Sequence, residues 1–183
     1  MLCGDVYQER GHMRYLVLVL PVLLAAGSAF AVDDEADSLV RSGIVEFMST
    51  LQTGDGQTAS LMFSSGALAQ VEVMLNSIKQ SLDREPEATI SRLNSAGYSI
   101  ELENAEDWET EEYLSATLSL PVITARYAPY EMEIDSVTVS GREAAIALTF
   151  RTATGVEIPQ QAIMIFENDS WKVSSFMGIT AFP

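Results

Sequence analysis

The sequence predicts an α+β fold, with helices in the first half of the chain and an antiparallel sheet in the second. Between residues 37 and 118, apolar residues recur every three or four positions, which is the period of a helix that buries one face. After Pro129 the period changes to two, as in strands with one buried face. A run of helices followed by a run of strands is typical of α+β layering.

A leader precedes the predicted domain. Arg14 supplies a positive flank, residues 15–24 are apolar, and Ala29 and Ala31 are small residues at the two positions that a signal peptidase reads. We therefore expect residues 1–31 to be a signal peptide and the protein to be periplasmic or secreted.

The mature chain is expected to begin at Val32 and to form a single domain over residues 32–183, a length that suits one domain and not two. Either Met1 or Met13 is the true start. Residues 1–12 contain Asp5 and Glu9, which do not suit the start of a signal peptide, so this stretch is a candidate non-native start.

Cleavage after Ala31 removes the only cysteine, Cys3, and the only histidine, His12. The mature chain would then lack thiolate and imidazole groups for nucleophilic catalysis, general-base catalysis or metal binding. We expect no cofactor, no metal and no catalytic residue of these types. Because no cysteine follows the cleavage point, a lipid anchor is not expected, and we predict no stable membrane anchor.

The charge of the mature chain excludes another class of partner. Past Ala31 the chain holds eight Lys and Arg residues against 24 Asp and Glu residues. The resulting negative field repels phosphate backbones and anionic headgroups, so no nucleic acid partner is expected.

Two helices are predicted most clearly. The first has Asp37 as its N-cap and ends at the Gly54-Asp55-Gly56 turn. The second covers residues 67–82, and its apolar positions step by three and four residues. These positions are Leu68, Val71, Leu75, Ile78 and Leu82.

The remaining elements before the sheet are shorter. A helix is expected over residues 58–63, another begins at Pro86 and ends at Gly97, and a third covers residues 111–118 and is ended by Pro121. The alternation in residues 98–103 predicts a short strand.

Four strands form the predicted meander, over residues 130–135, 144–151, 156–166 and 171–177. Their turns fall at Ser140-Gly141, Thr154-Gly155 and Asn168-Asp169. Pro159 lies inside the third strand, where it indicates a bulge or an edge position.

The strand region resembles a known family. The run Ser140-Gly141-Arg142-Glu143-Ala144, followed by Glu167 to Val173 with its Trp-Lys-Val sequence, is similar to the C-terminal half of the nuclear-transport-factor-2-like (cystatin-like cone) superfamily, in particular exported members of unknown function. This resemblance implies a curved antiparallel sheet wrapped around N-terminal helices. It also implies a cone-shaped cavity that serves different members as ligand pocket, active site or dimer scaffold.

Five residues are candidates for ligand binding: Tyr98, Arg126, Tyr127, Tyr130 and Arg151. Tyrosines bring a flat apolar ring with a hydroxyl, and arginines bind anions or stack on aromatic rings. The alternative is that the tyrosines pack at the edge of the core and the arginines pair with surface carboxylates.

Residues 101–112 hold seven carboxylates but neither glycine nor the Asp-x-Asp spacing of a calcium loop. We interpret this acidic run as a solvated surface and expect no metal there.

Two functional hypotheses follow. The first is an exported, non-catalytic binding or interaction module that holds a small apolar ligand in the cone or acts as a homodimer scaffold. The alternative is an enzyme of the isomerase or cyclase type, with Asp135 or a glutamate as base and a tyrosine as donor. A buried Asp135 carboxyl in a pocket would favour the enzyme, and a solvated one would remove its best base.

Overall fold

A computed structural model describes residues 34–176 of the chain, and the side chains of all of them except residues 102 and 103. Seven helices precede four strands in this range. The helices are α1 (Asp34–Thr53), α2 (Gly56–Ser60), α3 (Ser65–Arg84), α4 (Pro86–Ser95), α5 (Leu102–Glu106), α6 (Thr110–Leu118) and α7 (Pro121–Tyr127). The strands are β1 (Tyr130–Ser140), β2 (Glu143–Thr152), β3 (Glu157–Glu167) and β4 (Ser170–Phe176). The predicted leader lies outside the described residues, so it stays a prediction.

The four strands form one antiparallel sheet in the order β1-β2-β3-β4, and the predicted α+β fold class is confirmed. Its three turns lie where the sequence predicts them. Gly141 and Gly155 have positive φ, and so do Asn168 and Asp169, which suits a tight two-residue hairpin.

Among residues 34–176, Pro159 lies at a local edge, as the sequence predicts. In this range it pairs with Thr149 alone, because the last described β3–β4 pair is Ala162 with Phe176. The pairing shifts by one residue at Asp135 in β1 and again at Ser174 in β4. Such bulges increase the local twist of a sheet.

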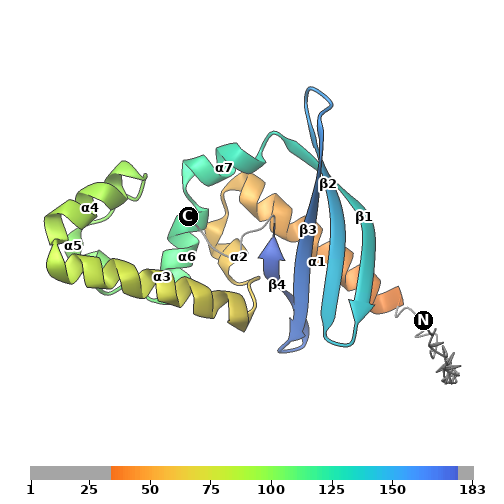
Figure 1. The fold of residues 1–183 in the computed structure, drawn as a ribbon, viewed down its shortest axis with the longest axis horizontal. Coiled ribbons are helices and arrows are strands. Elements are labelled where there is room, and N and C mark those ends of the chain that lie inside the picture. The colour runs from red at the N-terminus through yellow and green to blue at the C-terminus, as the bar shows by residue number, and fades with distance from the viewer. Residues whose placement is uncertain (1–33, 177–183) are drawn as a thin grey trace, which may run out of the picture. The chain divides into compact units, whose positions relative to one another are not determined.

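Helix α1 covers one face of the sheet, which we call the inner face (Figure 1). Alternate residues of β2 point into this interface and are almost completely buried: Ala144, Ile146, Leu148 and Phe150. The stripe of α1 that meets the sheet is equally buried and consists of Val40, Ile44, Phe47, Met48 and Leu51. Burying an apolar side chain of this size contributes about 1.5–3 kcal/mol, so this interface holds much of the folding free energy.

A second, smaller cluster lies among the helices. Figure 1 shows α4 and α5 beside α3, away from the sheet. Leu82, Leu93, Ile100 and Ala105 form its buried centre. The predicted stripe of α3 is therefore shared between two clusters, since Val71 and Leu75 belong to the main core.

Helices α1 and α2 begin earlier than predicted. Asp37 is not an N-cap; it lies in the first turn of α1, where Arg41 Nε donates to its carboxylate at 2.6 Å. Acidic residues in a first turn are favoured by the helix dipole, so α1 extends back to Asp34. Helix α2 begins at Gly56 because Asp55 caps it by accepting from the Thr58 amide at 3.0 Å.

The predicted strand over residues 98–103 is wrong. Ile100 exchanges two hydrogen bonds with the side chain of Asn94 and not with a neighbouring strand, at 3.0 and 3.1 Å. Tyr98 and Ile100 are partly or fully buried among helices, which reproduces the alternation of a strand. Helix α5 follows directly.

Pro121 follows the end of α6 at Leu118, but it also begins α7, which the sequence analysis missed. Proline suits the first turn of a helix as well as it ends one. No helix among residues 34–176 is long and apolar enough to cross a membrane.

We predict that Gly56→Ala destabilises the protein by about 1–3 kcal/mol, the usual cost of overpacking. A β-carbon at this position would meet the Ser115 carbonyl oxygen and the Ser119 side chain, and would lie 2.6 Å from the Ser119 amide nitrogen. Gly66→Ala is the matched control, since a β-carbon there meets no atom within 4 Å. Urea unfolding curves that show equal losses for both variants would contradict this close contact between α2 and α6.

Candidate functional site

The space between α1 and the sheet is filled by aromatic side chains of the protein itself. The Phe176 ring lies 5.2 Å from Phe47, 6.0 Å from Phe150 and 6.1 Å from Tyr127, measured between ring centroids. Each of these four side chains is at most 2% exposed. The interior that a cone-shaped ligand pocket would occupy is therefore part of the core in the described residues.

Tyr127 and Tyr130 belong to this core and its edge. Tyr127 is buried, and burial raises the pKa of its phenol. Tyr130 is half-buried, with its ring 5.7 Å from Phe150 in an edge-to-face arrangement. Gln52 fixes the backbone between them, since its amide donates to the carbonyl oxygens of both tyrosines, at 3.3 and 2.7 Å.

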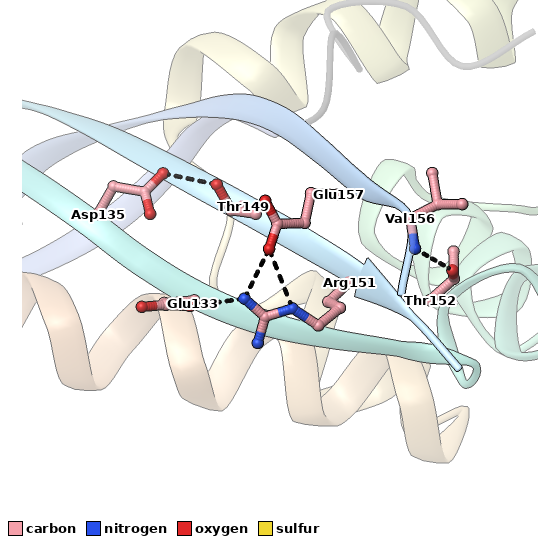
Figure 2. Close-up of polar contacts among 7 residues, drawn as sticks. All are labelled: Glu133, Asp135, Thr149, Arg151, Thr152, Val156 and Glu157. Carbon is pink, nitrogen blue, oxygen red and sulfur yellow. Dashed lines mark hydrogen bonds and ion pairs between the residues drawn. The ribbon is translucent and has the colours of Figure 1, made fainter. Parts of the chain in front are cut away.

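The two candidate arginines are exposed. Arg151 donates to Glu157 at 2.9 and 3.3 Å and lies 3.5 Å from Glu133, as Figure 2 shows. Its hydrogen bond and charge pairing with Glu157 raise the pKa of the guanidinium. Arg126 lies in the last turn of α7 and makes no ion pair with any described side chain.

Tyr98 lies in a different place, between α4 and α5. Its hydroxyl is 2.8 Å from Thr117 Oγ1, and its ring centroid is 5.6 Å from that of Trp108 and 6.3 Å from that of Tyr113. The five predicted residues thus do not form one site. Of the five, only Tyr98 lines one of the three hollows described below.

Asp135 is exposed on the face of the sheet opposite α1, which we call the outer face. It is the extra residue of the β1 bulge, and its carboxylate accepts a hydrogen bond from Thr149 at 2.9 Å (Figure 2). It borders a hollow of about 530 Å³ whose other lining residues include Gln160, Gln161 and Ser175 but no tyrosine. By the criterion set from the sequence, this exposed carboxyl does not support the enzyme hypothesis.

The outer face has an ordered distribution of charge, read from the strand pairing. A charged row, Glu131–Arg151–Glu157, crosses it near one end, and the row Ser140–Glu143–Ile165–Lys172 crosses it at the other end. The two rows nearest the second end row hold no charged residue; we call them the middle rows. They are Ser136–Ala147–Gln161 and Thr138–Ala145–Ile163–Ser175.

The sequence alone does not reveal the middle rows, because they arise from the pairing of outward residues across neighbouring strands. The signal that was available is the composition of β2, whose outward residues Ala145, Ala147 and Thr149 are small and uncharged. Solvated strand faces in a chain this acidic would be expected to carry more charge.

Two further hollows meet at Trp108. One, of about 720 Å³, lies between α2 and α6, and the other, of about 430 Å³, lies between the 97–100 segment and the start of α7. Asn104, Trp108 and Ala116 line both. Trp108 was not among the predicted site residues, although a tryptophan inside an acidic run is the signal that marks it.

The described residues contain no group of three or more Asp, Glu, His or Cys side chains that could hold a metal ion.

Comparison with known proteins gives one similar structure. No protein-family model matches the chain, and no curated protein matches it significantly. A crystal structure from Campylobacter jejuni described as a "Putative NTF2-like transpeptidase" is 16% identical, with 50% of this chain and 98% of that chain covered and a TM-score of 0.32. The helices followed by a four-stranded antiparallel sheet are α+β and consistent with an NTF2-like cone.

We predict that Tyr98 makes stability depend on pH in the alkaline range. Burial raises its pKa to about 12 from the ordinary value of 10.0, so above pH 10 the unfolded chain loses this proton before the folded chain does. The stabilisation is complete below pH 10 and is lost as the pH rises towards 12. The free energy of unfolding should therefore fall less steeply over this range in Tyr98→Phe than in the parent. Identical slopes in urea melts at stepped pH would contradict the assignment.

Proposed function

We propose that this protein is an exported, non-catalytic interaction module that forms a homodimer through the outer face of its sheet. The observation that carries the proposal is the contrast between the two faces of β2. Ala144 and Ile146 are at most 1% exposed against the core, whereas Ala145 between them is exposed and uncharged.

The filled interior of the described residues supports one of the two roles that the sequence left open. A small apolar ligand in the cone would have to displace fully buried side chains such as Phe150 and Phe176. Core packing leaves few voids, and rearranging such residues costs several kcal/mol. The described structure therefore favours the scaffold role, in which the binding surface is outside.

The outer face is large enough for this role. Four strands spaced by about 4.8 Å and about ten residues long give a face of roughly 650 Å². A standard interface buries about 800 Å² on each partner, so the sheet face supplies most of what a stable dimer needs.

The charge pattern suits a two-fold arrangement. If two copies stack with their strands antiparallel, the row Ser136–Ala147–Gln161 meets its own copy at the centre. The row Thr138–Ala145–Ile163–Ser175 then faces the row Glu133–Thr149–Pro159 of the second copy. The end row with Arg151 and its two glutamates then faces the end row with Glu143 and Lys172 of the second copy. Opposite charges can meet at both ends, which offsets the repulsion between two acidic chains.

The isomerase or cyclase alternative has less support. It requires a carboxylate and a phenol that face one cavity, and the hollow beside Asp135 has no tyrosine in its lining. Tyr98, whose pKa burial raises to about 12, lines a different hollow.

We predict that the protein sediments as a dimer at micromolar concentration and that Ala145→Glu converts it to a monomer. A glutamate at position 145 would face the row of the second copy that carries Glu133, so the stacked sheets would have to bury a further carboxylate near one of like charge. Ala69→Glu is the matched control, since Ala69 is an exposed alanine on α3, and it should remain dimeric. A monomeric parent chain, or a dimer that survives Ala145→Glu, would contradict the proposal.

A further inference from the structure

The crevice around Trp108 is a second surface feature that the sheet face does not use. Trp108 lies between α5 and α6, and both hollows beside it have volumes within the range of small-molecule sites. Three separate parts of the chain line the larger hollow: α2 and the residue after it, the end of α5 with its following turn, and α6. A site with walls from three elements can hold a ligand in a fixed orientation.

The aromatic part of the crevice is firmly placed. The Trp108 ring centroid lies 5.6 Å from Tyr98 and 5.4 Å from Tyr113. Tyr113 is 6% exposed and Tyr98 is hydrogen-bonded to Thr117, while Trp108 itself is half-buried and lines both hollows. Leu61 also lines the larger hollow, is 64% exposed and provides a second apolar surface.

The charged side chains beside this apolar surface are all acidic. Asp107, Glu111 and Glu112 line the larger hollow, and no basic side chain among the described residues forms an ion pair with any of them. Glu112 accepts a hydrogen bond from the Glu109 amide at 3.2 Å, which helps to hold it at the start of α6. No lysine or arginine lines either hollow.

We propose that this crevice binds a small organic cation, a molecule with an apolar or aromatic body and one ammonium or guanidinium group. The apolar body would lie between Trp108 and Leu61, and the cationic group would face the three carboxylates. A cation near a tryptophan face gains an electrostatic attraction in addition to the ion pairs. Apolar contact depends on the body of the ligand and charge attraction depends on its cationic group, so the two can be tested separately.

Phenethylamine is the probe, with phenethyl alcohol as its neutral analogue and phenylacetate as its anionic analogue. Trp108 fluorescence in a Trp171→Phe background reports binding at constant ionic strength. We expect the amine to bind about tenfold more tightly than the alcohol, the ratio that one charge-assisted contact of about 1.4 kcal/mol produces. The anion should bind least.

Two sets of variants distinguish a specific binding site from nonspecific attraction of the cationic probe to an acidic protein. Asp107→Asn/Glu111→Gln/Glu112→Gln should remove the preference for the amine over the alcohol. The matched control, Glu72→Gln/Asp83→Asn/Glu87→Gln, changes the charge by the same amount at exposed positions on α3 and α4 and should keep the preference. Trp108→Leu, checked for folding by circular dichroism and for binding by calorimetry, should weaken binding of both amine and alcohol.

The proposal is overturned by any of three results: no saturable binding of the amine, equal binding of amine and alcohol by the parent chain, or equal loss of the preference in the two triple variants.

Discussion

The packing of α1 on the inner face of the sheet is the interaction on which the other features depend. Phe47 from α1 and Phe150 from β2 both contact Phe176 at the end of β4, so the first helix and the last strand share one aromatic centre. The predicted mature chain has no cysteine, so no disulfide could hold these elements together. Burial has to supply the stability.

This packing also determines which surfaces the described core leaves uncovered. Because α1 fills the described inner face, the proposed binding surfaces are ones that the core does not use. The outer face is one such surface, and its bulges at Asp135 and Ser174 bend the two edge strands. The Trp108 crevice is another, and it lies where the smaller cluster around Leu82 and Ile100 joins the main core.

The sequence predicts the sheet well because β2 alternates between buried and more exposed residues and each turn has a residue suited to positive φ. Helix boundaries are less predictable. Asp37 and Pro121 each suit two positions in a helix, and only tertiary packing chooses between them. The 98–103 segment was misread because partial burial between helices gives the same alternation as pairing in a sheet.

The candidate site could be predicted only in part. Tyr127 and Tyr130 are near in the sequence and share a hydrogen-bond partner, but the sequence does not tell a core tyrosine from a ligand-binding one. The middle rows depend on register across four strands, which includes two bulges that no local pattern announces. Trp108 joins residues from α2, α5 and α6, a proximity that only the fold creates.

The central claim is that the inner face is closed and the outer face is available, and adjacent residues of β2 allow a direct test. With Cys3 replaced by serine, single cysteines can be introduced as Ala144→Cys and Ala145→Cys, on the inner and outer face. In dilute protein, Ala145→Cys should react fast with a soluble thiol reagent. Its reaction should slow as the protein concentration rises, because the proposed dimer covers the outer face. Ala144→Cys should stay unreactive until denaturant unfolds the chain. Equal reactivity of the two cysteines in dilute native protein would mean that the interior is an open pocket, and it would contradict this account.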